Sequence, residues 1–241
     1  MTDTLSYDVM TIIFNKSSFM AQIRLRQISD FVYDNLQMTD FYTIFIRNNV
    51  SDGVLGYYPY ITRLNAQYSR ITNVNYLMHL QVLNAECPCA IDQAGINELR
   101  YLVYLNANNN RNIVSVNHLT QLRVLGAGYA CGIDQAGFSE LQHIVQLRVC
   151  LNKGITSLNH LTSLRVLYAS GYSGIDQAGI AELKHIVKLD ASYNPKITSV
   201  NHLTQLSHLM ATGYSGIDRA GISELRNLVK LQALFNINLK N

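Results

Sequence analysis

The sequence repeats itself with a period of 42 residues. The stretch at 155–196, ITSLNHLTSLRVLYASGYSGIDQAGIAELKHIVKLDASYNPK, recurs with few changes, and the isoleucine that opens it stands at positions 71, 113, 155 and 197. A unit that repeats at a fixed length must bury its apolar face on its neighbours. The period therefore predicts a solenoid, a stack of similar coils in which each coil contacts mainly the next.

Each 42-residue unit divides into a half of 20 residues, such as 155–174, and a half of 22 residues, such as 175–196. Both halves end in the frame L-x-x-L-x-A-x-x-(N/Y). We predict nine coils over residues 54–241, because the frame occurs nine times. The second leucines of the nine copies are Leu64, Leu83, Leu105, Leu125, Leu147, Leu167, Leu189, Leu209 and Leu231.

The L-x-A part of the frame alternates apolar and variable residues. Such alternation predicts a short strand with Leu and Ala pointing inward, and one strand per coil gives a parallel sheet. In the short half, apolar residues from Ile197 to Leu206 step by three, which predicts a tight helical or 3₁₀ return. The long half predicts a longer return with Asp176 as its N-cap. Gly179 lies inside that return and predicts close packing between neighbouring coils.

This frame resembles the leucine-rich repeat, whose period is about 20–29 residues. The resemblance covers residues 54–241 and implies an α/β solenoid with parallel strands on its concave face. One departure from the family is that alanine fills the third inward position in most coils, which thins the interior there. A second departure is that the turn asparagine occurs only in the long halves. We therefore expect half of an asparagine ladder, with some other partner for the turn amides of the short halves. The asparagines are Asn110, Asn152, Asn194 and Asn236, and the short halves have Pro88, Ala130, Tyr172 and Tyr214 at that position.

Residues 1–35 contain none of the repeat. Apolar patterns over 5–15 and 18–36 predict two or three short helices, which are too small to form a comfortable core alone. The run LSYDVM at 5–10, the pair IF at 13–14 and the run IRLRQIS at 23–29 resemble the F-box motif, although Ser6 replaces the family's proline. That resemblance implies docking on a Skp-type adaptor of a cullin ubiquitin ligase. The matching side chains are Leu5, Val9, Met10, Ile13, Phe14, Ile23, Leu25 and Ile28.

Two interpretations of the first helices stay open. They form an F-box-like segment that makes the protein a substrate receptor of the ligase, or they only cap the end of a solenoid that acts as a binding or structural module. Residues 36–53 are predicted to be a packed connector. The near-identity of the 42-residue units is similar to the F-box and repeat proteins multiplied in large DNA viruses of amoebae (marseillevirus-like). That likeness implies a location in the host-cell cytoplasm.

The composition argues against several other functions. The net charge of +3 gives no reason to expect a nucleic-acid partner, and no apolar run approaches the roughly 18–20 residues that span a membrane. The N-terminus lacks the pattern of a secretory signal. We expect the four cysteines to be free thiols in a reducing compartment, because equivalent positions two coils apart lie about 10 Å from each other. The same distance argues against a metal bound by His118, His160 and His202.

The sequence contains no catalytic motif, so we predict a protein that is not an enzyme and uses no cofactor or metal. Function is then expected on the outward strand positions, which vary from coil to coil. The candidate partner-binding residues for an unknown protein target are Tyr104, Asn106, Arg148, Tyr168, Lys188, Asp190, His208 and Lys230. The last coil has no evident polar cap, which predicts that it is frayed or covered, for instance by a second copy in a homodimer.

Overall fold

The computed structural model describes residues 21–22, 39–42 and 50–239. The predicted F-box-like segment therefore lies outside the described residues, apart from Ala21 and Gln22, and so does most of the predicted connector. The adaptor-binding residues of the prediction that lie outside are Leu5, Val9, Met10, Ile13, Phe14, Ile23, Leu25 and Ile28.

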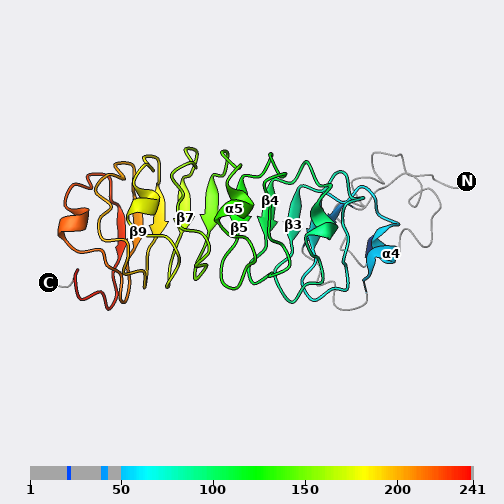
Figure 1. Ribbon diagram of the computed structural model, residues 1–241, viewed down its shortest axis with the longest axis horizontal. Coiled ribbons are helices and arrows are strands. Elements are labelled where there is room, and N and C mark those ends of the chain that lie inside the picture. The colour runs from blue at the N-terminus through cyan, green and yellow to red at the C-terminus, as the bar shows by residue number, and fades with distance from the viewer. Residues whose placement is uncertain (1–20, 23–38, 43–49, 240–241) are drawn as a thin grey trace, which may run out of the picture.

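The described chain forms an elongated solenoid around one ten-stranded sheet (Figure 1). The strands follow one another in chain order, and each is parallel to the next. The nine predicted leucines are the middle residues of β2–β10, so the frame identified every strand of the repeats. The strands are β1 (Asp40–Phe41), β2 (Arg63–Asn65), β3 (Val82–Asn84), β4 (Tyr104–Asn106), β5 (Val124–Gly126), β6 (Gln146–Arg148), β7 (Val166–Tyr168), β8 (Lys188–Asp190), β9 (His208–Met210) and β10 (Lys230–Gln232).

The sheet register places the central leucines in one inward row, with Leu64 beside Leu83 and so on to Leu209 beside Leu231. All but Leu231 are buried, and Leu231 in the last strand is 42% exposed. The alanine column lies next to this row and is buried from Ala66 to Ala211, with Val149 in the same position. Apolar side chains of the returns complete the core. The predicted in-and-out alternation of the strands is therefore confirmed.

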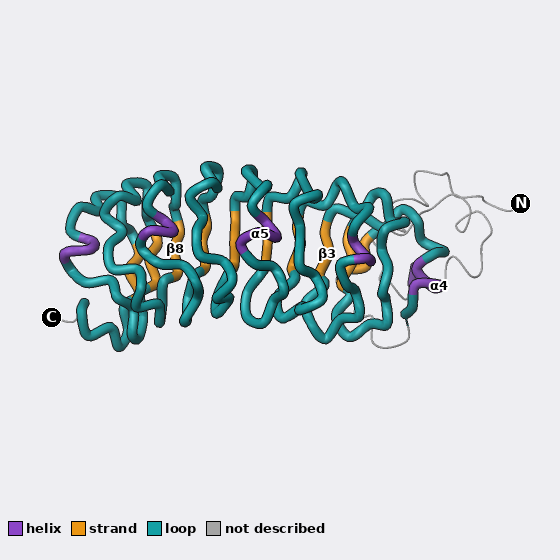
Figure 2. The backbone as a smooth tube through the Cα atoms, in the orientation of Figure 1, coloured by secondary structure: helices purple, strands orange, loops and turns teal. Residues whose placement is uncertain are grey.

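Within residues 50–239, helical turns occur in the returns of the long halves and, before the first 42-residue unit, at Asp52–Leu55 (Figure 2). Asp176 accepts a hydrogen bond at Oδ1 from the Gly179 amide at 2.9 Å, as predicted for a cap. The short-half returns, predicted to be helical or 3₁₀, contain no helix. They are successive tight turns in which Leu203 N donates to Val200 O and Leu206 N donates to Leu203 O, each at 2.9 Å. The helical elements are α4 (Asp52–Leu55), η1 (Ala94–Ile96), α5 (Gln135–Phe138), η2 (Ala178–Ile180) and η3 (Ala220–Ile222).

Buried asparagines close the long halves, as predicted. The amide nitrogen of Asn194 donates to Ala169 O at 3.1 Å and to Ile175 O at 3.0 Å, and Asn110, Asn152 and Asn236 repeat the pattern. Each of these side chains satisfies backbone carbonyls 25 and 19 residues earlier in the chain. The ladder thus ties every long half to the coil before it.

The short halves close differently from the prediction. Pro88, Ala130, Tyr172 and Tyr214 are exposed, whereas the next residue is the inward turn side chain. It is buried at Ser173 and Ser215 and partly buried at Cys89 and Cys131. These small groups take part in local hydrogen bonds, as where the Ser173 hydroxyl donates to Ala169 O at 3.1 Å. The backbone amides of these turns donate to the backbone carbonyl of the asparagine in the preceding coil. Gly174 N, for example, donates to Asn152 O at 2.7 Å.

Candidate functional site

The outward side chains of the sheet form one continuous surface along the solenoid, which we call the strand face. It consists of the first and third residues of each strand, and all eight predicted partner-binding residues lie on it in β4 and β6–β10. The backbone between them is already paired within the sheet. A ligand on this face must therefore be recognised by side chains.

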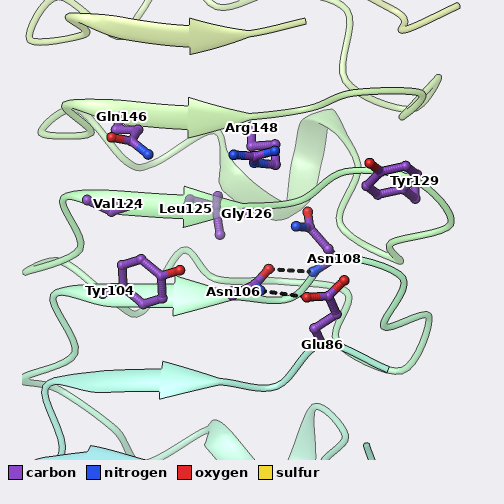
Figure 3. Close-up of a pocket in the computed structure, with 10 residues that line it drawn as sticks. All are labelled: Glu86, Tyr104, Asn106, Asn108, Val124, Leu125, Gly126, Tyr129, Gln146 and Arg148. Atoms are coloured by element: carbon purple, nitrogen blue, oxygen red, sulfur yellow. Dashed lines mark hydrogen bonds between the residues drawn. The ribbon is translucent and has the colours of Figure 1, made fainter. Parts of the chain in front are cut away.

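A hollow of about 280 Å³ interrupts the strand face at β5 (Figure 3). It lies where Gly126 takes the third strand position, between Asn106 of β4 and Arg148 of β6. A Cβ added to Gly126 would lie 2.7 Å from Asn106 Oδ1 and 3.3 Å from the side-chain amide of Asn108, so a larger residue here would push against the asparagines that line the hollow. Ten side chains or backbones line it: Glu86, Tyr104, Asn106, Asn108, Val124, Leu125, Gly126, Tyr129, Gln146 and Arg148.

The wall of the hollow toward the N-terminus is held in place by hydrogen bonds. Asn106 donates from Nδ2 to Glu86 Oε2 at 2.9 Å, and its Oδ1 accepts from the Asn108 amide at 3.2 Å (Figure 3). Asn108 in turn accepts from the Gly128 amide at 2.7 Å. Side chains fixed in this way lose little further freedom when a ligand binds, which favours affinity.

Tyr104 forms another part of the same wall. Burial, followed by a side-chain hydrogen bond with its neighbour Tyr42, raises the pKa of Tyr104 to about 12. The two rings lie edge to face with centroids 6.3 Å apart. Tyr104 therefore keeps its hydroxyl proton at neutral pH and can offer a ligand a hydrogen-bonding group beside an aromatic face.

Beyond the hollow, the cationic side chains of Arg148 and Lys188 both contact the ring of Tyr168. The guanidinium carbon of Arg148 lies 4.6 Å from the Tyr168 ring centroid, and Lys188 Nζ lies 5.2 Å from it. Arg148 lines the hollow as well, so this cluster and the hollow form one site. The site thus contains three of the eight predicted partner-binding residues that are large enough to anchor a ligand, Tyr104, Arg148 and Tyr168.

The remaining candidate residues lie toward the C-terminal end of the strand face. Lys188, His208 and Lys230 occupy equivalent positions of β8, β9 and β10, and Asp190 lies beside Tyr168 in the register. The Asp190 carboxylate accepts a hydrogen bond from the Ser192 amide at 3.0 Å. These residues extend the site but do not line the hollow.

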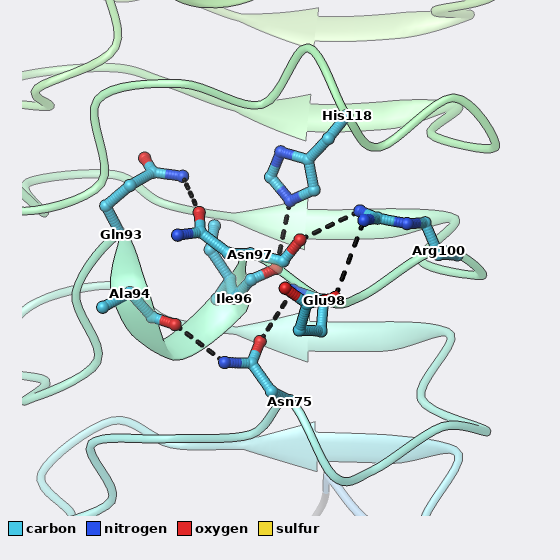
Figure 4. A network of polar contacts seen from close by, with 8 residues as sticks. All are labelled: Asn75, Gln93, Ala94, Ile96, Asn97, Glu98, Arg100 and His118. Carbon is cyan, nitrogen blue, oxygen red and sulfur yellow. Dashed lines mark hydrogen bonds and ion pairs between the residues drawn. The ribbon is translucent and has the colours of Figure 1, made fainter.

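The histidines of the short halves lie among the returns rather than on the strand face. His118 Nε2 contacts Ile96 O at 3.0 Å, within a network that includes the side chain of Asn75 bonded to Ala94 O at 2.7 Å (Figure 4). Burial lowers the pKa of His118 and of His160. These histidines therefore take part in the packing between neighbouring coils, as where the His160 ring meets Phe138 with centroids 5.1 Å apart. Among the described residues, no group of three or more His, Cys, Asp or Glu could hold a metal ion.

A second hollow of about 700 Å³ lies at the edge of the sheet where the strands begin. His79 stacks on Tyr60 there, with ring centroids 5.6 Å apart. No Lys, Arg, Asp or Glu lines this hollow, so it lacks charged groups that would orient a ligand. The lining residues are Thr39, Tyr60, Thr62, Met78, His79, Gln81 and Tyr101. We therefore assign the candidate site to the strand face.

Sequence reasoning missed the part that small residues play in this site. Gly126, Glu86, Gln146 and Tyr129 line the hollow but are not among the residues predicted from the sequence. The available signal was the contrast between Gly126 and the large side chains at the same position of β4, β6 and β7. A gap in a row of side chains becomes visible once the strands are set in register.

The fold is a solenoid of the leucine-rich-repeat type, with one parallel strand per coil and few helices. The functional domain of InlJ from Listeria monocytogenes, which includes a cysteine ladder, is 19% identical with a TM-score of 0.54, over 85% of this chain and 50% of that one. An internalin, InlF, from the same organism is 19% identical with a TM-score of 0.54, over 76% and 65%. A TLR13 structure in complex with ssRNA13 is 18% identical with a TM-score of 0.50, over 83% and 35%.

These likenesses show the fold alone. This chain spans about half the length of the InlJ domain and about two thirds of the InlF structure. No protein-family model and no curated protein matches the sequence. Within residues 21–22, 39–42 and 50–239, no helix has both the length and the apolar character needed to cross a bilayer.

Proposed function

We propose that this protein is a non-enzymatic binding module that holds a protein partner on its strand face. The observation that carries the proposal is the combined site at β4–β8, where the Gly126 hollow adjoins Tyr168 flanked by Arg148 and Lys188. Tyrosine and arginine beside a preformed hollow are the residues that most often anchor protein interfaces. The inward leucines and alanines recur from coil to coil, while the outward third strand position changes from Asn106 through Gly126, Arg148 and Tyr168 to Asp190 along β4–β8.

Site-specific photo-crosslinking tests this proposal. A photoreactive phenylalanine in place of Tyr168 is expected to crosslink a protein partner in cells. The matched control places the same group at Lys184, which is exposed on the return between η2 and β8. Partner crosslinks that form from position 184 and not from position 168 would move the binding surface off the strand face.

The finer form of the proposal is a substrate receptor of a Skp-cullin-F-box ligase. Its support is the sequence pattern at residues 5–29, together with the pairing of β1 to β2, which ties residues Asp40 and Phe41 to the solenoid. In this form the first helices bind a Skp-type adaptor in the cytoplasm while the strand face presents the target. The alternative form, a module whose first helices only cap the solenoid, needs no adaptor.

A pull-down with a Skp-type adaptor separates the two forms. The double variant Leu5→Asp plus Ile13→Asp places two charges among the predicted adaptor contacts and is expected to abolish adaptor binding. A double variant of two strand-face residues, Tyr104→Ala plus Tyr168→Ala, is expected to leave adaptor binding unchanged. Adaptor binding that survives the aspartate variant excludes the F-box mechanism.

We also propose that a second copy of the chain covers the last described coil. Strand β10 pairs with β9 over three residues, so this coil is not frayed, but apolar side chains remain open beside it. Leu234, Phe235 and Ile237 are 71%, 75% and 73% exposed. Light scattering is expected to show a dimer that Phe235→Asp dissociates, whereas a monomer mass at all concentrations would exclude it.

A further inference from the structure

Basic side chains gather on the strand face toward β10. Lys188, His208 and Lys230 hold the first position of β8, β9 and β10, and the register pairs Lys188 with His208 and His208 with Lys230. Neighbouring strands are about 4.8 Å apart, so the three side chains stand in a single row. A row of like groups across a sheet costs stability in the unbound protein. We call this set, with Arg148, the basic row.

Within the described part of the chain, no member of the basic row forms an ion pair with an acidic side chain. The two ion pairs found there join Arg63 to Asp40 and Arg100 to Glu98, both far from β8–β10 in the sequence of coils. Asp190 is the acidic residue that the strand face offers nearby, and its carboxylate accepts a hydrogen bond from the Ser192 amide. The charge of the row is therefore left for solvent or a ligand.

Tyr168 holds two members of the row in place. Its ring lies between Arg148 and Lys188, with cation-to-centroid distances of 4.6 and 5.2 Å. Cations over an aromatic face are attracted to its π electrons and so lose part of their mobility before any ligand arrives. The ring thereby links the hollow at β5 to the lysines of β8 and β10, and the basic groups run from β6 to β10 along one surface.

We propose that the occupant of this surface is an acidic segment of the partner protein, bound in an extended conformation across β6–β10. The inference rests on the proposed function and adds the chemistry of the bound segment. Four strand spacings make about 19 Å, which an extended chain covers in about six residues. Alternate side chains of such a chain point the same way, so acidic residues at every second position would face the row. Uncharged Met210 and Gln232 border the row and fit the neighbouring positions of a peptide better than a continuous polyanion.

Selection from a random peptide library against the full chain tests the chemistry. The expected peptides carry Asp or Glu at alternate positions and lose affinity when these are replaced by Asn or Gln. In the double variant Lys188→Gln plus Lys230→Gln, their affinity is expected to fall about tenfold, as for two partly exposed ion pairs, and to depend less on salt. The matched control is Lys184→Gln plus Arg226→Gln, which removes the same charge from the exposed returns and is expected to leave affinity unchanged.

The outcomes separate this inference from the proposed function. Enriched peptides that lack acidic residues but lose binding in the Tyr104→Ala variant would overturn the acidic segment and leave the strand face as the binding surface. If no enriched peptide is weakened by any strand-face variant, both proposals fall. A single-stranded RNA that binds more tightly than the selected peptides, and loses affinity in the Lys188 and Lys230 variant, would overturn the assignment to a peptide. Thermal unfolding confirms that each variant is folded.

Discussion

Replacing Asn194 by alanine tests the account of how the coils are joined. The side chain is fully buried and makes four hydrogen bonds. Its amide nitrogen donates to Ala169 O at 3.1 Å, to Ser173 Oγ at 3.2 Å and to Ile175 O at 3.0 Å. Its oxygen accepts from the Lys196 amide at 3.0 Å. The substitution removes all four bonds at once.

The loss of unfolding free energy in Asn194→Ala depends on which of the four partners can form another hydrogen bond. Ala169 O still accepts from the Ser173 hydroxyl, and Lys196 is exposed enough for water to reach its amide. Ile175 belongs to the buried core, and its carbonyl loses the donor that the structure gives it. An unsatisfied buried polar group costs about 1–3 kcal/mol. With the weaker losses at the other partners, Asn194→Ala is expected to lower the free energy of unfolding by about 2–4 kcal/mol.

Two further variants test whether the buried hydrogen-bond donors of Asn194 cause the loss of stability. Asn159 also makes two hydrogen bonds between coils, donating to Ala178 O at 2.9 Å and accepting from Glu182 N at 3.1 Å, but it lies where water can replace it. Asn159→Ala is therefore expected to cost less than about 1 kcal/mol. Asn194→Asp keeps the acceptor and loses the donors, so it should destabilise at least as much as Asn194→Ala.

Urea unfolding followed by circular dichroism measures these differences. Because each coil of a solenoid contacts mainly its neighbours, the transition can divide in two at the damaged coil. Hydrogen exchange at the amides of Ser173–Ile175 reports the local part of the effect. Equal losses for Asn194→Ala and Asn159→Ala, or wild-type stability in Asn194→Asp, would refute the claim that buried donors join the coils.

Three further predictions concern other contacts between coils. Gly179→Ala should lower the thermal midpoint, although the same change usually stabilises a helical turn, because the new Cβ would overlap the Thr156 carbonyl of the preceding coil; a raised midpoint would contradict the packing. Burial lowers the pKa of His118 below 6.5, so the folded protein keeps the full contribution of neutral His118 to its stability above pH 6.5 and loses it as the pH falls below that value. Between about pH 7.5 and about pH 5, the thermal midpoint of His118→Gln should therefore fall less than that of the wild type. Burial raises the pKa of Cys89 and of Cys131 to about 11, so iodoacetamide at neutral pH should label both only after unfolding, as mass spectrometry can show, and rapid labelling of the folded protein would be the contrary result.

The repeat period predicted the fold because strand positions obey a simple alternation. Leucines from Leu64 to Leu231 are all at strand centres, since only one phase of the L-x-A pattern puts apolar side chains inside. The returns of the short halves were predicted less well. A step of three residues, as from Val200 to Leu206, is shared by 3₁₀ helices and by successive tight turns, and the sequence does not separate them.

The turn of the short halves was misplaced by one residue for a chemical reason. Asparagine is the polar group that the leucine-rich-repeat frame predicts at this turn, and Tyr172 stands at its position. The structure uses the smaller Ser173 instead, because the asparagine of the adjacent long half already fills the space and supplies the donors. At the candidate site, alternation located Arg148 and Tyr168 on the outward face. The contact of Arg148 with Tyr168 depends on side-chain conformation, and so does the hollow beside Arg148. The repeat pattern does not specify side-chain conformation.

The alternation of large and small turn residues also limits how such a chain can change its length. The donors of Asn194 reach back to a turn that holds Ser173, and a second asparagine there would compete for the same buried volume. Loss or gain of a single coil would set two like turns next to each other. Gene duplication can therefore add or remove coils without penalty only in pairs, which fits the 42-residue spacing of its copies. A designer who wished to lengthen the strand face would have to insert coils two at a time.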